Sequence, residues 1–365
     1  MATLRVENIS KSYGKVEALK NVSFSCGKND FVAILGSPGA GKTTLLKVLA
    51  GLEECNNGRI YYEDEDITDV DPRERNVSMA FESYALYPHL PVRENILHPL
   101  KVRGEHSETQ MKDRLEEVTT MLRITELMER KTNQLSGGQR QRVGLARALI
   151  RDNPRLLLLD EPIAHLDATL RHWLRGELKQ YLKARNTTTI YSTPDYLEAM
   201  GMGDQVVVLS SGTVIQNSAP RLLFERPQNT EIAGLIGDPP INIVRVKVES
   251  ADGVLSIALG GVHMPVPEKW RKVLESRSSS DVIVGLRPWD ITIGKQPFGN
   301  AVKGSVYVQE SMQRKKVFCV QVEGNLIKVN TPLEVDYDLE EQVWLGLDLE
   351  KALLYDAQTE LLIED

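Results

Sequence analysis

Residues 36–43, with the sequence GSPGAGKT, place three glycines, a lysine and a threonine at a characteristic spacing. Glycines allow backbone N–H groups to curl around a phosphate, and a helix that begins directly after them adds positive potential. In the pattern G-x-x-x-x-G-K-[ST] the lysine reaches the β- and γ-phosphates of a nucleotide, and the hydroxyl holds Mg²⁺. We therefore expect ATP and Mg²⁺ to bind through Gly36, Ser37, Pro38, Gly39, Ala40, Gly41, Lys42, Thr43 and Thr44.

Two carboxylates follow an apolar run in LLLLDE, residues 156–161. A buried strand that ends in Asp160 places this carboxylate at the carboxyl edge of a parallel sheet, where ligands of open α/β folds bind. Asp160 would support Mg²⁺ together with Thr43, commonly through the water shell of the ion. Glu161 would then polarise a water molecule for attack on the γ-phosphate.

The segments around these residues alternate between strand and helix patterns. The run FVAILG at 31–36 is typical of a strand buried on both faces, and leucines at helical spacing follow it up to Gly51. Runs at 156–160 and 187–193 predict two more buried strands, so we expect a mostly parallel α/β sheet. Antiparallel strands, an amphipathic helix and a hairpin are predicted within residues 4–24, 111–130 and 205–216.

Past residue 236 the helical patterns nearly disappear, and short alternating runs such as IVRVKV and VFCVQV follow one another. Many short strands at this spacing favour one or two small barrels of the oligonucleotide/oligosaccharide-binding type. We therefore expect an α/β nucleotide-binding domain at residues 1–235 and an all-β barrel domain at 236–365. Such a barrel could bind a sugar, an anion or nucleic acid, or serve in regulation and dimerisation.

The composition is that of a folded cytosolic protein. Of 365 residues, 41% are hydrophobic and 26% are charged, close to the average of globular proteins. No run approaches the ~18 uncharged apolar residues that a membrane span needs, and we expect no signal peptide. The net charge of −7 disfavours binding to nucleic acid through phosphate neutralisation. The wide spacing of Cys26, Cys55 and Cys319 argues against a zinc site or a disulfide framework.

The segment LSGGQ at 135–139 matches the signature of ATP-binding-cassette proteins in all five positions. The chain resembles this family over residues 1–235. YALYPHLPVREN at 84–95 and the barrel-like tail are similar to the ATPase subunits of bacterial sugar, polyol and glycerol-phosphate importers, such as the maltose importer. GLRPWDI at 285–291 resembles a segment of their C-terminal domain, so the resemblance extends over essentially the whole chain.

The resemblance implies that two cassettes pair head to tail, with each ATP between one chain's phosphate loop and the other chain's signature. Tyr13 matches the aromatic residue that stacks on adenine, and Asp167 matches an aspartate that communicates across the dimer. The family also implies transmembrane permease subunits that contact residues 84–96, indirectly a solute-binding protein, and a peripheral place on the inner face of the cell membrane. Four signature residues would act on the partner's ATP: Ser136, Gly137, Gly138 and Gln139.

Three positions depart from the family pattern. The family places a histidine that contacts the γ-phosphate where this chain has Pro194, which has neither a side-chain donor nor an N–H. Glu82 replaces a glutamine, and an ionised carboxylate can accept but not donate a hydrogen bond. Glu82 could still bind Mg²⁺, but its charge would face the phosphates. Ala164 stands where the family usually has a serine, and His165 is the nearest histidine that could substitute at the site.

Both Glu82 and Pro194 belong to the ATP site built on this chain's own phosphate loop, whereas the signature is intact. This asymmetry predicts a degenerate subunit of a heterodimeric ATPase pair, which binds ATP and hydrolyses it weakly. Two alternatives stay open: a non-hydrolytic regulatory cassette, and a homodimeric sugar-importer ATPase with unusual residues at these positions. A soluble cassette acting in translation or DNA repair is disfavoured by the acidic charge and the barrel tail.

Overall fold

The computed structural model describes residues 3–251, 254–277, 281–312 and 315–363. Packing divides the chain into two compact units, Met1–Leu223 and Phe224–Asp365. Within the described residues, none of the helices is both long and apolar enough to cross a membrane.

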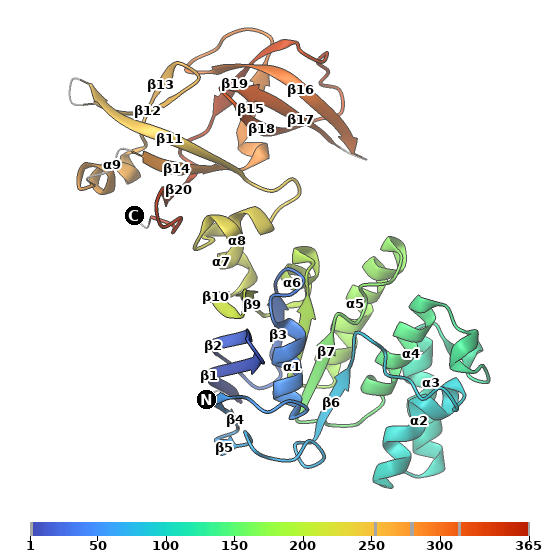
Figure 1. The fold of residues 1–365 in the computed structure, drawn as a ribbon. Helices are drawn as coiled ribbons and strands as arrows, with labels where there is room; N and C mark the ends of the chain where they lie inside the picture. Colours follow the sequence, from blue (N-terminus) through green and yellow to red (C-terminus); the bar gives the residue numbers. More distant parts are fainter. Residues whose placement is uncertain (1–2, 252–253, 278–280, 313–314, 364–365) are drawn as a thin grey trace. The chain divides into compact units, whose positions relative to one another are not determined.

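The N-terminal unit contains two sheets (Figure 1). The first is antiparallel with the strand order β2-β1-β4-β5, and the second has the order β10-β9-β3-β8-β7-β6 and is parallel except for β10. The first sheet consists of β1 (Leu4–Tyr13), β2 (Val16–Cys26), β4 (Asn57–Tyr62) and β5 (Glu65–Asp66). The second consists of β3 (Phe31–Leu35), β6 (Val77–Ala80), β7 (Leu156–Asp160), β8 (Thr189–Thr193), β9 (Gln205–Ser210) and β10 (Thr213–Ser218).

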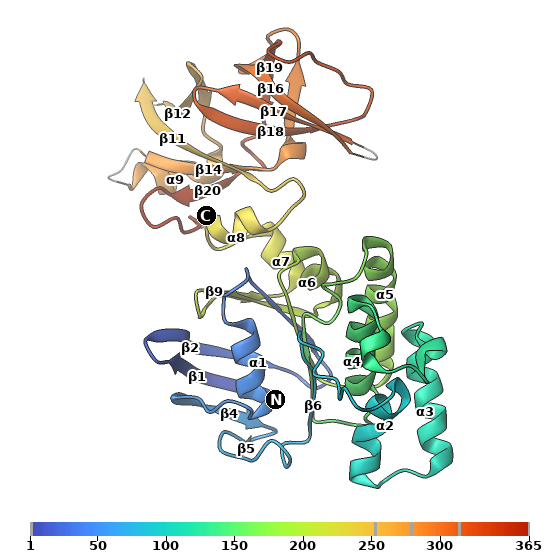
Figure 2. The same cartoon turned by 45° about the vertical axis from the view of Figure 1, so that its right-hand side comes forward.

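Helix α1 (Lys42–Ala50) lies between the two sheets (Figures 1 and 2). Its leucines pack in one core with apolar side chains of β1, β3 and β7, and all five residues of β3 are buried. The helix ends at Gly51, whose φ of 76° is the left-handed conformation that glycine adopts readily. The predicted buried strands, the helix and the hairpin that turns at Ser211-Gly212 are confirmed.

The other face of the six-stranded sheet is covered by a helical part (Figure 2). The amphipathic helix predicted within 111–130 is shorter than expected, because Arg123 has a left-handed φ of 51° and breaks the helix after Met121. Leu127 still joins the core, from a short 3₁₀ turn. The helices of this part are α2 (Val92–Arg103), α3 (Glu108–Met121), α4 (Gly137–Leu149), α5 (Ala168–Ala184) and α6 (Tyr196–Met202). Helix α7 (Pro220–Glu225) contains the boundary between the two units, after Leu223.

The C-terminal unit is built from two five-stranded antiparallel sheets, with the orders β13-β12-β11-β14-β20 and β15-β19-β16-β17-β18. Their inward side chains form one shared core, as expected for a barrel-like domain. The strands are β11 (Asn242–Ala251), β12 (Val254–Leu259), β13 (Val262–Pro265), β14 (Asp281–Leu286), β15 (Ile291–Gly294), β16 (Val302–Met312), β17 (Lys315–Val322), β18 (Asn325–Thr331), β19 (Gln342–Leu347) and β20 (Leu353–Asp356).

Two helices of the C-terminal unit are not apparent from the strand pattern. Helix α9 (Glu268–Glu275) buries Trp270 and Leu274, which lie one turn apart. Helix α8 (Thr230–Leu235) buries Ala233 against Ile283 and Tyr355 of the first sheet. The boundary predicted at 235/236 assigns α8 to the preceding domain, whereas by packing this helix belongs to the C-terminal unit.

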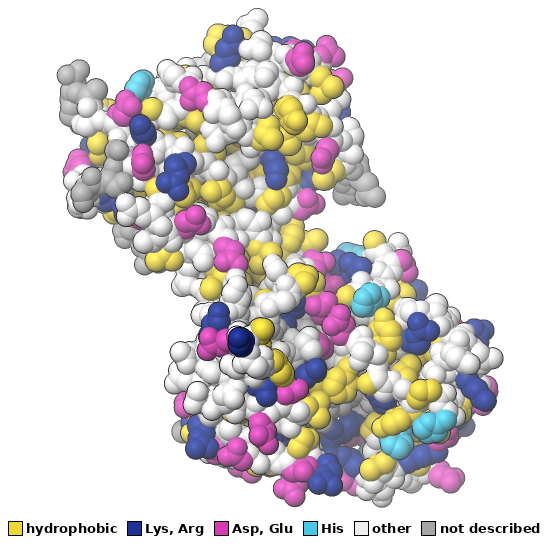
Figure 3. Space-filling view, viewed as in Figure 1, with side chains coloured by type: hydrophobic (Ala, Val, Ile, Leu, Met, Phe, Trp, Pro, Cys, Tyr) yellow, Lys and Arg dark blue, Asp and Glu magenta, His cyan; other side chains and the backbone are white. Residues whose placement is uncertain are grey.

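Charged side chains of both signs are interspersed over the N-terminal unit on the face shown in Figure 3. This face offers no broad basic region of the kind that a nucleic-acid backbone needs.

Candidate nucleotide-binding site

The loop between β3 and α1 is closely fitted to its neighbours. A Cβ on Gly36 would lie 2.3 Å from the carbonyl oxygen of Leu209, and a Cβ on Gly41 would lie 2.6 Å from that of Ala18. Gly41 also has a φ of 105°, a backbone conformation that residues with a side chain rarely adopt. Glycine is therefore required at both positions, and the loop delivers its backbone N–H groups to the start of α1, as phosphate binding requires.

Lys42 is the first residue of α1, and its side chain is almost completely buried. Its ammonium donates to the carbonyl oxygens of Gly36 at 2.9 Å and Ser37 at 3.3 Å. It also pairs with Oε1 of Glu161 at 3.1 Å. The sequence-predicted cation and the sequence-predicted general base thus meet at the phosphate loop.

Thr43 and Asp160 form the second contact between the loop and the sheet. The Thr43 hydroxyl donates to Oδ1 of Asp160 at 3.2 Å, and the Ser192 hydroxyl donates to the same oxygen at 2.7 Å. Burial raises the pKa of Asp160, while the hydrogen bonds from Ser192 and Thr43 oppose this shift. A hydroxyl oxygen and a carboxylate oxygen beside a phosphate loop are ligands that suit Mg²⁺.

A cavity of about 490 Å³ opens beside the loop, a size that suits a small-molecule ligand. Six of the predicted phosphate-loop residues line it, together with Glu82 and Glu161. The sequence gives no signal for several other lining residues, because the fold alone brings the β2 segment and the β9–β10 turn to the loop. These residues are Val16, Glu17, Ala18, Lys20, Ser211 and Gly212.

Tyr13 and Pro194 do not line this cavity. Among the other residues predicted for the ATP site, the same holds for Gly36, Ser37, Ala40 and Asp160. Tyr13 ends β1 with an exposed ring, over which the Lys11 ammonium lies at 5.0 Å. Pro194 occupies the turn between β8 and α6, where Asp195 caps the helix by accepting from the N–H of Leu197 at 2.7 Å. The candidate substitute His165 hydrogen-bonds the Tyr84 hydroxyl at 3.3 Å, and among the described residues that line the cavity none is a histidine.

The signature residues lie at the start of α4. The Ser136 hydroxyl accepts from the N–H of Gln139 at 3.3 Å, and the Gln139 side chain accepts from the N–H of Ser136 at 2.9 Å. This capping box fixes the helix N-terminus, and Ser136 stays exposed. Asp167 caps α5 in a similar way, accepting from the N–H of Leu170 at 2.9 Å, and is also exposed.

Ser192 and Gln141 belong to the site, although the motifs do not include them. Ser192 contacts both Asp160 and the backbone of Glu161. Gln141 reaches the backbone of Glu161 from α4. A serine beside Thr193 in a buried strand and a glutamine two residues after the signature were the available signals, and both are weak without the tertiary structure.

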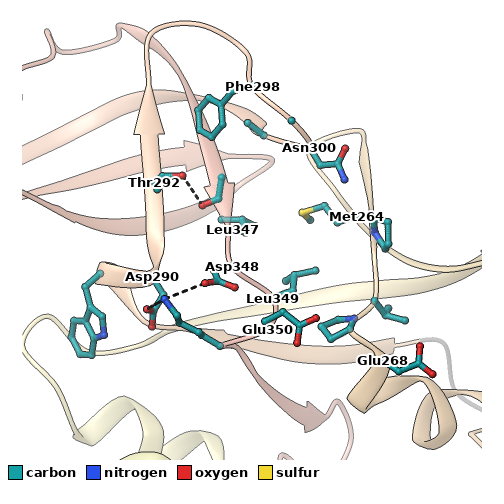
Figure 4. Close-up of a pocket in the computed structure, with 18 residues that line it drawn as sticks. Met264, Glu268, Asp290, Thr292, Phe298, Asn300, Leu347, Asp348, Leu349 and Glu350 are labelled. Carbon is teal, nitrogen blue, oxygen red and sulfur yellow. Dashed lines mark hydrogen bonds and ion pairs between the residues drawn. The ribbon is translucent and has the colours of Figure 1, made fainter.

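A second cavity, of about 560 Å³, lies in the C-terminal unit (Figure 4). Asp290 and Asp348 line it, and Lys351 pairs with them at 3.4 Å and 3.2 Å. Trp289 also lines it but stacks on Phe224, with the two ring centroids 6.1 Å apart. Among the described residues that line this cavity, no buried side-chain polar atom lacks a hydrogen-bond partner. We assign no ligand to it.

The comparisons with known proteins agree with this geometry. Residues 19–164 match a family described as ABC transporter. The oligosaccharides import ATP-binding protein MsmX of Bacillus subtilis is 35% identical over 100% of both chains. The trehalose/maltose import protein MalK of Thermococcus litoralis is 38% identical over 89% of each chain. The sn-glycerol-3-phosphate import protein UgpC of Cereibacter sphaeroides is 38% identical over 79% of this chain and 78% of its own.

A solved structure gives the same result for the fold. The dimeric ATP-binding cassette MJ0796, in a post-hydrolysis state with ADP and Pi, aligns with a TM-score of 0.56 and 31% identity. The alignment covers 60% of this chain and 99% of the cassette. The fold and the site therefore define a phosphate-loop ATPase. More particularly, the chain belongs to the family of ABC transporter ATP-binding proteins, with a barrel-like domain after the cassette.

Proposed function

We propose that this chain is the energy-coupling ATPase subunit of an importer for a sugar, a polyol or a glycerol-phosphate-like solute. Relatives named as import ATP-binding proteins match over most or all of the chain, which supports this assignment. The observation that carries it is the meeting of Lys42, Thr43, Asp160 and Glu161 at one phosphate loop. The solute itself would be selected by other subunits.

In this proposal the loop N–H groups and Lys42 hold the phosphates of ATP, and Tyr13 stacks on the adenine. Thr43 and Asp160, with Glu82, would hold Mg²⁺, which neutralises phosphate charge when it is bound. Glu161 accepts a proton from the attacking water. Its pairing with Lys42 at 3.1 Å keeps the carboxylate beside the loop.

The proposal includes a second cassette. The exposed N-terminus of α4 presents the N–H groups of Gly137 and Gly138 and the Ser136 hydroxyl, which suit the γ-phosphate of a partner's ATP. Asp167 lies exposed at the adjoining start of α5. Residues 84–96 would contact a permease subunit, which would place the chain on the inner face of the cell membrane.

We further propose that the two ATP sites of the complex are unequal. At this chain's own loop, Glu82 adds a negative charge to the cavity that receives the phosphates, and Pro194 supplies no donor at the turn after β8. The signature has no such defect. The chain would thus complete a partner's active site while its own site turns over weakly, as one half of a heterodimer.

Nucleotide binding tests the basic assignment. Lys42→Ala should weaken binding of Mg-ATP by the purified chain, because the ammonium that faces the β- and γ-phosphates is lost. Thermal unfolding of the variant without nucleotide serves as the control for folding. ATP affinity equal to that of the wild type would contradict the assignment of this loop. Identification of the subunits that co-purify with the chain would then show whether a permease and a second ATPase accompany it.

A further inference from the structure

Gln141 connects the signature helix to the loop that carries Glu161. The residue lies on α4, in the turn after the signature, and is 3% exposed. Its side-chain Nε2 donates to the carbonyl oxygen of Glu161 at 2.9 Å, and its Oε1 accepts from the backbone N–H of His165 at 3.1 Å. The nitrogen and the oxygen of the side-chain amide therefore both form hydrogen bonds with the loop between β7 and α5.

The peptide of Glu161 is held from the opposite side by Ser192. The N–H of Glu161 donates to the carbonyl oxygen of Ser192 at 3.2 Å and to its hydroxyl at 3.1 Å. Glu161 itself has a left-handed φ of 45°. A residue other than glycine keeps this conformation only where its surroundings hold it, and here Ser192 and Gln141 do so.

The same loop also supports the signature. A Cβ on Gly138 would lie 3.1 Å from Cδ2 of Leu166, so the loop and the first turn of α4 are in close contact. Arg171 fastens the end of the loop by donating to the carbonyl oxygens of Ala164 at 2.8 Å and Leu166 at 2.9 Å. Gln141 is thus the polar link in a packed connection between the signature and Glu161.

We propose that Gln141 is a positioning residue that ties the signature helix to the peptide of Glu161, so that a displacement of the signature also displaces this carboxylate. The inference rests on the proposed function, because the tie has a consequence only if the signature engages another cassette's ATP. Loss of the tie would leave the Glu161 carbonyl and the His165 N–H without these partners. It would loosen the signature as well, and it would leave the phosphate loop untouched.

Two variants of Gln141 in the assembled transporter test the tie. Gln141→Met keeps a similar length and removes both hydrogen bonds, whereas Gln141→Glu keeps an acceptor for His165 and loses the donor to Glu161. Gln180→Met, at an exposed position on α5, is the matched control. The measurements are kcat and KM for ATP of the transporter, and the Kd of the isolated chain for Mg-ATP.

We expect kcat to fall at least about tenfold in both Gln141 variants, because a loosened signature misplaces its donors at the partner's ATP, where small misplacements are costly. KM and Kd should stay within about twofold of the wild type, and the control should match it. Unchanged kcat in both variants would overturn the inference and leave the proposed function standing, as would a Kd that rises in step with the loss of kcat.

Failure of the wild-type chain to bind Mg-ATP would instead contradict the proposed function. Should Gln141→Met fail to fold, as judged by thermal unfolding, Gln141→Glu decides the result, since it retains one of the two hydrogen bonds.

Discussion

At the scale of single residues, two buried carboxylates accept hydrogen bonds from hydroxyl side chains of β8. Asp160 accepts from Ser192, and Glu198 accepts from the hydroxyls of Tyr191 at 2.8 Å and Thr193 at 2.7 Å. Glu198 is 3% exposed. Burial raises its pKa above the ordinary value of 4.5, and the hydrogen bonds from Thr193 and Tyr191 only partly oppose this. A charged Glu198 is therefore less stable in the folded protein than in the unfolded chain.

The raised pKa of Glu198 predicts a pH-dependent effect of its replacement. A group with a raised folded-state pKa contributes stability that is present below the ordinary value of 4.5 and is lost as the pH rises through the folded pKa. Glu198→Gln keeps an acceptor for both hydroxyls and never becomes charged. We expect the variant to be at least as stable as the wild type at neutral pH, and this advantage to shrink as the pH falls toward 4.5. Urea unfolding across this range measures it; an advantage that grows with acidity would contradict the prediction.

Gly36 tests the fit of the phosphate loop at the same scale. In Gly36→Ala the new methyl group would meet the carbonyl oxygen of Leu209 at 2.3 Å, which backbone cannot easily avoid. We expect a loss of about 1–3 kcal/mol in the free energy of unfolding, together with weaker binding of Mg-ATP.

Gly176→Ala is the control for Gly36→Ala, because a methyl group on this exposed helical glycine meets nothing within 4 Å. It should raise stability by about 0.5–1 kcal/mol and leave ATP binding unchanged. Equal stability of the two alanine variants would contradict the close fit of Gly36 against the carbonyl oxygen of Leu209.

At the scale of elements, local patterns suffice where a segment's neighbours in sequence are also its neighbours in the site. The strand at 31–35, its glycine-rich turn and the helix from Lys42 follow one another directly, and the sequence predicts all three. The end of α3 after Met121 depends on a left-handed Arg123 that the apolar spacing does not indicate. The contacts of Ser192 and Gln141 join segments far apart in the chain, so no local pattern contains them.

The signature helix supports a prediction about the partner's site. Ser136→Arg places a long cationic side chain at the exposed N-terminus of α4, where the proposed function puts a partner's γ-phosphate. ATPase activity of the assembled transporter should fall to a small fraction of the wild-type rate, because the arginine intrudes on that site. Binding of Mg-ATP by the isolated chain should persist, since Lys42 and the phosphate loop are unchanged. Full activity of the Ser136→Arg transporter would show that the signature faces no nucleotide.

At the scale of the whole molecule, the proposed difference in turnover between the two sites depends on two features of this chain's site: a missing donor and a retained base. Loss of one preorganised donor to transition-state charge typically costs about 2.7–4 kcal/mol, or roughly 10²–10³ in rate, and Pro194 supplies no such donor. Glu161, in contrast, is present and held beside Lys42 at 3.1 Å. If the two sites are unequal as proposed, the chemistry at this site is limited by positioning rather than by a missing base. Pro194→His combined with Glu82→Gln should raise turnover at this site.

Unequal turnover is measured most directly by the steady-state ATPase rates of two assembled transporters. One carries Glu161→Gln in this chain, and the other carries the equivalent change in the partner ATPase. Removal of a base from a site that already turns over weakly should leave most of the activity, whereas the same change in the partner should remove it. Near-total loss of activity from Glu161→Gln in this chain would contradict the proposal that its own site is the weak one.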